Sequence, residues 1–266
     1  MSKVILITGA SSGLGYAMAD YLASKGNKVY GTSRSIRNEG QNFKTLAMDV
    51  CNSASIHEAV SHIIKEEGRI DVVINNAGLG IAGAVEHLSI TDMDRLFDTN
   101  VMGVLRVCQA VLPFMRKNRS GKIINISSIG AEFGLPYRGG YSASKAALDR
   151  LMEALRMEVK TFGIQVCTLQ PGGIITDINK NRIMTQMPEG SPYKESFNRT
   201  YEIIHASVSS GLTAQSFGSV VEKIINSSKM KPNYRVGKTM EKLSVLIKKI
   251  MPAFVFEKII MNHYKI

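Results

Sequence analysis

Residues 8–15 read Thr8-Gly9-Ala10-Ser11-Ser12-Gly13-Leu14-Gly15 and join an apolar run, Val4–Thr8, to a stretch of helical period, Leu14–Lys25. Glycines in such a joint let the backbone turn sharply and approach a pyrophosphate, and the start of a helix attracts negative charge. The spacing is GxxxGxG, which differs from the common GxGxxG fingerprint. The motif therefore predicts a dinucleotide site, with a purely structural turn as the alternative.

The same order of strand and helix repeats along the chain. Buried strands are predicted for six runs that are apolar nearly throughout, and a seventh near Tyr234–Val236; the six are Val4–Thr8, Lys28–Thr32, Phe43–Met48, Ile70–Asn75, Lys122–Ser127 and Ile164–Gln170. Helices are predicted between them, each ending near a glycine (Gly26, Gly68, Gly121, Gly163): Leu14–Lys25, Ala54–Glu67, Thr91–Lys117 and Ser142–Phe162. This pattern predicts an α/β fold, a single doubly wound Rossmann domain of about seven parallel strands with helices on both faces.

Two segments interrupt this rhythm. Residues 177–210 are polar, contain Pro188 and Pro192 and follow the sixth strand, where substrate loops and lids are built. Residues 238–266 form a basic amphipathic extension that we expect to be helical. We therefore expect 1–237 to be the dinucleotide-binding and catalytic domain and 238–266 to be an extension of the same domain.

The chain is basic. Its 266 residues carry a formal charge of +11, and residues 229–266 hold nine Lys or Arg against two acids, a net of +7. A solvated basic surface is the first interpretation, and attraction to anionic lipid or to an acidic partner is the alternative. Nucleic acid is not expected as a partner, because no basic stripe is interleaved with aromatic residues.

The bulk composition is that of an ordinary globular protein, with 44% hydrophobic and 21% charged residues. No stretch is long and apolar enough to span a membrane, and the first residues run into a strand rather than a signal peptide. Cys51, Cys108 and Cys167 are scattered, so we expect reduced core thiols in a cytoplasmic protein and no metal site.

The end of the second strand bears on the cofactor. A carboxylate there would bind the ribose 2′-hydroxyl of NAD, whereas an arginine accommodates the 2′-phosphate of NADP. The sequence is Thr32-Ser33-Arg34, with no acid before Glu39. A guanidinium matches a phosphate in shape and charge. The sequence thus favours NADP(H), unless Arg34 is an ordinary surface arginine.

Tyr141-Ser142-Ala143-Ser144-Lys145 opens the helix after the fifth strand. Residues four apart share one helix face, and a nearby ammonium favours the phenolate, so Tyr141 can exchange a proton with a substrate oxygen. Ser128 ends a strand thirteen residues earlier, and Asn75-Asn76-Ala77-Gly78 ends another.

These motifs together resemble the short-chain dehydrogenase/reductase family, in its single-domain branch, over roughly residues 1–230. The motifs that carry the resemblance are TGASSGLG at 8–15, Asp49-Val50, NNAG at 75–78, Asn100, Ser128, YSASK at 141–145 and PGGIIT at 171–176.

The resemblance implies a role for each matched residue toward the cofactor. The diphosphate would be held by Gly9, Ser12, Gly13, Leu14 and Gly15, with Ser11 and Arg34 near the 2′-phosphate. Asp49 and Val50 would border the adenine, and Asn76, Ala77 and Gly78 the adenosine ribose. Tyr141 and Lys145 would meet the nicotinamide ribose, and Pro171, Gly172, Ile174 and Thr176 would orient the carboxamide.

The resemblance also implies the chemistry. Ser128 would donate a hydrogen bond to the substrate oxygen, Tyr141 would be the acid/base, Lys145 would support it, and Asn100 would anchor a proton relay through water, with no metal required. Asn100 could instead only bridge helix backbone, and Asp49 could instead cap the helix that follows the third strand.

The function expected is NADP(H)-dependent hydride transfer between nicotinamide and a carbonyl or alcohol, on a small hydrophobic substrate resembling a steroid, retinoid or acyl lipid. Reduction of 3-oxoacyl groups on an acidic carrier protein is one alternative, and a non-catalytic NADP(H) sensor is another. Family resemblance suggests a homo-oligomer, a dimer or tetramer, formed through helices 91–117 and 142–162, unless the sheet uses up their apolar faces. The tail is expected to dock on the body or a partner subunit, with a peripheral membrane contact or a cover over the substrate mouth as alternatives.

Overall fold

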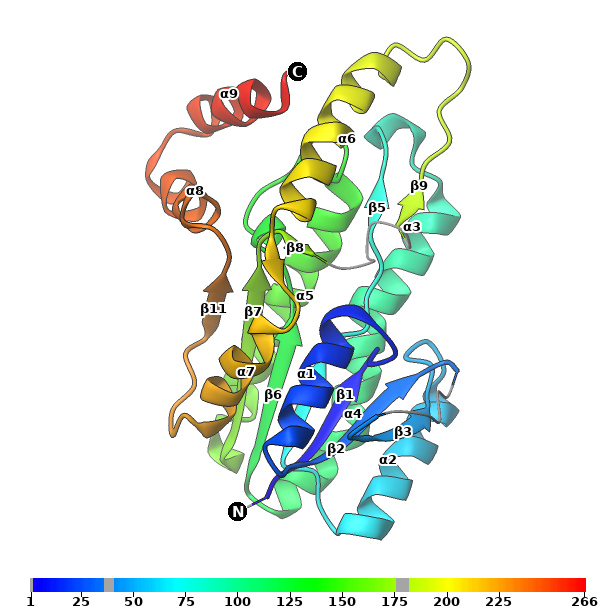
Figure 1. Cartoon of the computed structure of the whole chain (residues 1–266), viewed down its shortest axis with the longest axis vertical. Helices are drawn as coiled ribbons and strands as arrows, with labels where there is room; N and C mark the ends of the chain where they lie inside the picture. The colour runs from blue at the N-terminus through cyan, green and yellow to red at the C-terminus, as the bar shows by residue number, and fades with distance from the viewer. Residues whose placement is uncertain (1, 36–40, 176–181) are drawn as a thin grey trace.

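The computed structural model describes residues 2–35, 41–175 and 182–266. Its centre is a sheet of seven strands in the order β11-β7-β6-β4-β1-β2-β3, all pairing in parallel (Figure 1). The strands are β1 (Val4–Thr8), β2 (Lys28–Ser33), β3 (Lys44–Ala47), β4 (Val72–Asn75), β6 (Gly121–Ile126), β7 (Ile164–Pro171) and β11 (Asn233–Val236). The predicted doubly wound Rossmann architecture is confirmed, including the strand near Tyr234.

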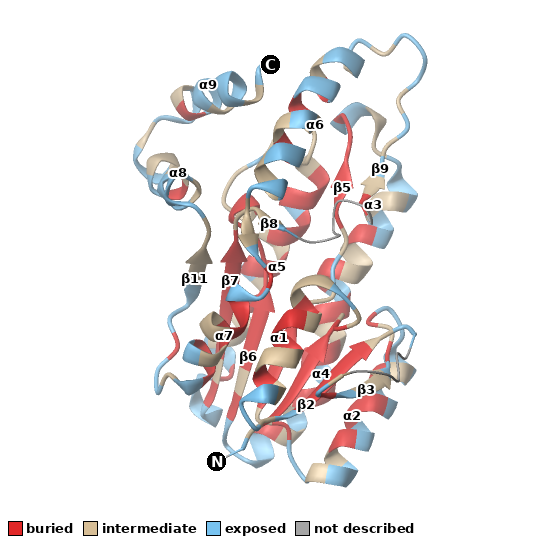
Figure 2. Ribbon diagram, in the orientation of Figure 1, coloured by how far each residue is buried: buried red, intermediate tan, exposed pale blue. Residues whose placement is uncertain are grey.

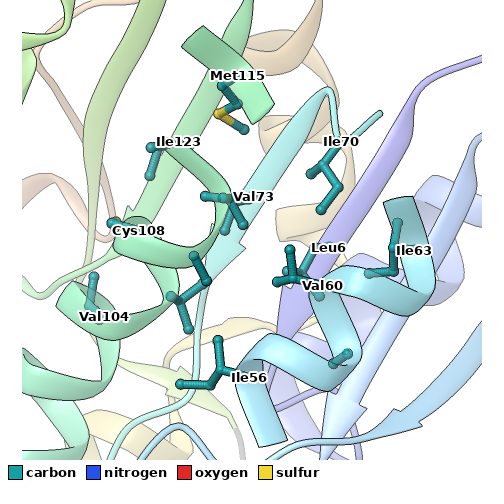
Figure 3. Packing of buried hydrophobic residues seen from close by; sticks show 14 of the residues in the cluster. Leu6, Ile56, Val60, Ile63, Ile70, Val73, Val104, Cys108, Met115 and Ile123 are labelled. Atoms are coloured by element: carbon teal, nitrogen blue, oxygen red, sulfur yellow. The ribbon is translucent and has the colours of Figure 1, made fainter. Parts of the chain in front are cut away.

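Helices cover both faces of this sheet. On one face Leu6 packs with side chains of α2 (Ser53–Glu67), α4 (Gly103–Lys117) and α5 (Gly139–Glu158), as Figure 3 shows for the first two helices. On the other, Ile5 and Ile7 pack with α1 (Gly13–Ser24) and α7 (Ser216–Asn226). Alternate residues of a strand point to opposite faces, so a strand that is apolar throughout serves two cores. Figure 2 shows the resulting buried layers.

The helix ends follow local chemistry. Asn52 caps α2, its side chain accepting hydrogen bonds from the N–H groups of Ala54 and Ser55, so the alternative role of Asp49 as that cap is wrong. Gly26, Gly68 and Gly163 adopt the left-handed conformation as predicted. Gly121 does not: it begins β6, and Arg119 takes the left-handed conformation after α4, with φ of 49°.

The predicted helix Thr91–Lys117 is divided in three. It comprises α3 (Ile90–Phe97), a π-helical turn over Asp98–Met102, and α4. A π-helical turn changes the direction in which the following side chains point, and such turns often occur at functional sites. The predicted helix Ser142–Phe162 begins earlier, at Gly139, and ends in a 3₁₀ turn over Lys160–Phe162.

The segment predicted as an irregular substrate loop contains regular structure. Between two short strands, β9 (Ile183–Met184) and β10 (Leu212–Thr213), lies α6 (Lys194–Ser209), which buries Phe197, Thr200 and Ile204 at helical spacing. Strand β9 pairs with β5 (Ile81–Ala82), and β10 with β8 (Ile174–Ile175). The tail is helical as predicted, but it forms two helices, α8 (Thr239–Ile250) and α9 (Ala253–Tyr264), separated at Pro252. The predicted domain boundary at residue 237 stays a prediction.

Two loops at the carboxyl ends of β1 and β4 are tied together by Thr8 and Asn76. The Thr8 hydroxyl accepts hydrogen bonds from the N–H groups of Asn76 and Ala77, both at 2.9 Å. In return, Asn76 Nδ2 donates to the carbonyls of Thr8 at 2.9 Å and Gly9 at 3.0 Å. The two loops therefore hold each other in place.

We predict that Thr8→Val destabilises the protein by about 1–3 kcal/mol, because two buried N–H groups lose their shared acceptor. Thr32→Val is the matched control: Thr32 is equally buried on the neighbouring strand, but its hydroxyl makes only a 3.4 Å hydrogen bond with the Ile7 carbonyl. Urea unfolding measures the free energy of unfolding of both variants. Equal losses would contradict the role given to Thr8.

Candidate active site

A cleft of about 1240 Å³ runs along the carboxyl ends of the strands and under the tail. It brings together residues that the sequence placed in six separate motifs. Those that line it are Gly9, Ser11, Ser12, Gly13, Leu14, Arg34, Asp49, Val50, Asn76, Ala77, Gly78, Ser128, Tyr141, Lys145, Pro171, Gly172 and Ile174. Gly15 and Asn100 are not among the lining residues, and Thr176 lies outside the described residues.

The glycine loop forms a cradle at one end of the cleft. Gly9 and Gly13 have φ of 67° and 57°, and helix α1 begins at Gly13 without a hydrogen bond from the Ser12 side chain. The first N–H groups of α1 and its positive dipole end thus face the cleft, which suits a diphosphate. Gly15 lies behind the loop, where a Cβ atom would stand 2.3 Å from the Gly9 carbonyl oxygen. The close packing leaves no room for a side chain at this position, and Gly15 does not line the cleft.

Another part of the cleft is bordered by the residues that follow β2 and β3. Arg34 is exposed and lines the cleft between Ser33 and Ser35. The Asp49 carboxylate accepts a hydrogen bond from the Cys51 N–H at 2.9 Å. Cys51 is exposed in this part of the cleft, which corrects the expectation of three core thiols. The other two are buried, and burial raises the pKa of Cys108 and Cys167 to about 12.

The reacting centre lies at the middle of the cleft. Tyr141 and Lys145 are buried one turn apart on α5, and the Lys145 ammonium donates to the Ile126 carbonyl at 2.8 Å. Ser128 caps a 3₁₀ turn over Ile129–Ala131, its hydroxyl accepting from the Gly130 N–H at 3.0 Å. The hydroxyl keeps its proton for a further acceptor, so a carbonyl oxygen in the cleft could receive hydrogen bonds from both Ser128 and Tyr141.

Asn100 occupies the π-helical turn and is fully buried. Its side chain accepts from the Leu79 N–H at 2.8 Å and donates to the Leu79 carbonyl and to the Ser144 hydroxyl, both at 3.0 Å. These contacts join the loop after β4 to the catalytic helix α5. Asn100 therefore joins loop backbone to a side chain of α5 rather than bridging helix backbone, and the proton relay stays a prediction.

A buried polar network supports the loop that carries Ser128. Gln170 Nε2 donates to Glu132 at 2.9 Å and to Asp149 at 2.8 Å, and Arg235 donates to Glu132 at 2.7 Å. Burial raises the pKa of Asp149. Burial also opposes the charge of Glu132, but hydrogen bonds from Arg235 and Gln170 hold the pKa of its carboxyl below the ordinary range.

The tail forms the outer wall of the cleft. The Glu241 carboxylate accepts from the N–H groups of Gly173 at 2.9 Å and Lys238 at 2.7 Å, and Phe256 is buried edge-to-face against Phe133, with ring centroids 5.0 Å apart. The tail residues that line the cleft are Met240, Glu241, Ser244, Ile247, Phe256, Ile259, Ile260, His263 and Tyr264. The tail thus docks on the body of its own chain and lines the cleft.

Sequence reasoning did not assign these tail residues to the site, nor two arginines on the cleft wall, Arg138 and Arg182. The apolar spacing of the tail was visible in the sequence, but its docking partner was not. Arg138 directly precedes the catalytic helix, and the guanidinium carbon lies 4.8 Å from the centre of the Tyr141 ring.

Comparison with known proteins agrees with this site. The sequence pattern of the family described as short chain dehydrogenase matches residues 3–186. The chain is 43% identical to a 3-ketodihydrosphingosine reductase of Bacteroides thetaiotaomicron, over 94% of this chain and 93% of that protein. It is 33% identical to human retinol dehydrogenase 8, over 70% of this chain and 63% of that protein.

Among solved structures, a short-chain dehydrogenase from Streptomyces avermitilis superposes with a TM-score of 0.82 at 27% identity, covering 100% of this chain and 96% of that chain. The overall fold agrees with that structure. The chain belongs to the short-chain dehydrogenase/reductase family of oxidoreductases.

Proposed function

We propose that this protein is an NADP(H)-dependent reductase of a long-chain lipid ketone, related to the substrate named for its 43% identical relative, 3-ketodihydrosphingosine. The observation that carries the proposal is the form of the cleft. Its lining includes Ser128, Tyr141 and Lys145 together with apolar side chains of the tail, Ile247, Phe256 and Ile259 among them. A polar reacting centre that opens into an apolar wall suits a ketone borne on a hydrocarbon chain.

The residues of the cradle fit the cofactor. The positive φ angles of Gly9 and Gly13 and the uncapped start of α1 suit the diphosphate, and Lys145 lies close enough to the loop after β4 that a Cβ atom on Gly78 would be 3.5 Å from its ammonium. Lys145 is thereby positioned to bind the hydroxyls of the nicotinamide ribose. When bound, NADPH supplies the hydride.

Side chains of the protein stabilise and protonate the oxygen of the substrate. Negative charge develops on the carbonyl oxygen as the hydride arrives, and hydrogen bonds from Ser128 and Tyr141 stabilise it there. Tyr141 then gives its proton to that oxygen. In the oxidative direction the same residues act in reverse.

We predict that Tyr141→Phe lowers kcat for reduction of a long-chain ketone by NADPH by about 10²–10⁴-fold, because the acid is lost while the ring remains. Tyr234→Phe is the matched control, since its hydroxyl accepts from the Lys231 N–H at 2.9 Å, away from the cleft. NADPH absorbance follows both rates.

The same assay separates the alternative functions. Unchanged turnover in Tyr141→Phe would overturn the catalytic assignment. Turnover only of carrier-bound 3-oxoacyl groups, weakened by salt, would favour the carrier-protein alternative. Tight NADPH binding without oxidation by any carbonyl compound would favour the sensor.

The cofactor preference depends on Arg34. We predict that NADPH binds at least about tenfold more tightly than NADH, a difference of about 1.4 kcal/mol, and that Arg34→Ala removes most of this preference. Lys117→Ala, which removes an exposed positive charge away from the cleft, should leave the preference intact. Titration of nicotinamide fluorescence measures both. Equal binding of NADH by the unaltered protein would contradict the assignment of Arg34.

We also propose that the tail rests on an anionic membrane surface. In the described part of the chain no helix is long and apolar enough to cross a membrane. The tail nevertheless exposes large apolar side chains, such as Leu246, Ile250 and Phe254, beside Lys248 and Lys249. Such a face can bind the boundary between headgroups and acyl chains.

We predict that the protein floats with vesicles containing anionic phospholipid, and that Ile250→Ser combined with Phe254→Ser abolishes flotation. Met157→Ser, at an equally exposed apolar residue of α5, should float like the unaltered protein. Absence of the unaltered protein from the floated fraction would leave docking on the body as the only role of the tail. Self-association through α4 and α5 and a cytoplasmic location stay predictions.

A further inference from the structure

Two arginines meet on the cleft wall beside Tyr141. Arg182 directly precedes β9, and hydrogen bonding of the Ile183 N–H to the Gly80 carbonyl at 2.8 Å holds that strand in place. Its side chain lies along Gly80, where a Cβ atom would be 3.4 Å from Nε. Arg138 reaches the same region from the start of α5, over the Tyr141 ring. Both side chains line the cleft.

Arg182 has a hydrogen bond with Tyr201, but each of the two guanidinium groups keeps one buried nitrogen without a hydrogen-bond partner among the described residues. Arg182 is only 8% exposed, and its Nη1 has no hydrogen-bond partner among the described residues. The same holds for Nε of half-buried Arg138. Neither arginine forms an ion pair with a carboxylate of the described chain. Two adjacent buried cations that pair with no carboxylate in the described part of the chain are costly.

The electrostatics of the pair agree with this geometry. Burial, and secondly the positive charge of Arg138, lower the pKa of Arg182. The phenols that interact electrostatically with one or other of these arginines are those of Tyr141, Tyr201 and Tyr264. Of the carboxylates that line the cleft, Asp98 pairs with Arg106 at 2.7 Å and Glu241 accepts hydrogen bonds from backbone N–H groups.

We propose that Arg138 and Arg182 form a subsite for an anionic group on the substrate, next to the ketone that Tyr141 protonates. This inference rests on the proposed function and specifies its substrate: a long-chain ketone with an acidic headgroup such as a carboxylate, sulfonate or phosphate. A guanidinium fork binds such oxyanions with two parallel hydrogen bonds, and the unpartnered Nη1 and Nε supply donors. A cationic headgroup would meet repulsion at the same place.

The test compares a long-chain γ-keto carboxylate with its primary amide, which has nearly the same shape but no charge. We expect the unaltered protein with NADPH to favour the acid at least about tenfold in kcat/KM. Arg182→Met should abolish this preference by lowering the rate with the acid, and the rate with the amide should change less than about twofold. Arg95→Met, at an exposed arginine of the same cleft, should keep the preference.

A second measurement tests the subsite without relying on turnover or on a single variant. A saturated long-chain carboxylate, with NADP⁺ present, should raise the melting temperature more than its amide does, and Arg138→Met should remove that difference. Equal effects of acid and amide on the unaltered protein, in rate or in melting temperature, would overturn the subsite. If neither ketone is reduced while the acid alone still stabilises the protein, the proposed function fails and the subsite stands.

Discussion

The hydrogen bonds between the Thr8 hydroxyl and the loop after β4 are the constraint on which the cleft depends. The sheet order changes direction between β1 and β4, since the chain proceeds from β1 to β2 and β3 on one side and from β4 to β6, β7 and β11 on the other. Ligands of doubly wound sheets bind at such a switch point. The hydrogen bonds of Thr8 and Asn76 join the two loops at this switch point and leave the cleft open. They hold the glycine loop at Gly9 at a fixed distance from the loop at Gly78.

The constraint extends to the reacting centre through Asn100. This residue holds the Leu79 backbone on one side and Ser144 on the other, so the loop that Thr8 anchors also sets the position of α5. Tyr141 and Lys145 are carried by the first turns of that helix. The nucleotide cradle and the acid/base pair are therefore parts of one hydrogen-bonded frame. These hydrogen bonds explain why the polar Asn100 is fully buried in a π-helical turn.

Local sequence patterns were enough to predict the strands of the sheet, the glycine loop and the site residues that follow the strands. Strands such as Val4–Thr8 are apolar nearly throughout, and left-handed glycines such as Gly68 end several of the helices. Helix α6 escaped prediction because its buried face includes Thr200 and because Pro188 and Pro192 just before it indicate a loop. Arg138 and Arg182 escaped because they are forty-four residues apart in the sequence. Only the pairing of β5 with β9 brings them to one wall.

The arrangement of charged and apolar side chains in the cleft indicates how a substrate would enter it and what the tail would contribute. Cationic groups lie beside Tyr141, and the apolar side chains of α8 and α9 lie at the mouth. An amphiphile with an acidic headgroup would enter with its headgroup first and leave its hydrocarbon chain along Phe256 and Ile259. The apolar side chains that the tail exposes, Ile250 and Phe254, belong to the same two helices. A substrate drawn from a bilayer would thus pass along one continuous apolar element before its ketone reaches Ser128 and Tyr141. The hydrophobic effect favours each step, since the chain need not enter water.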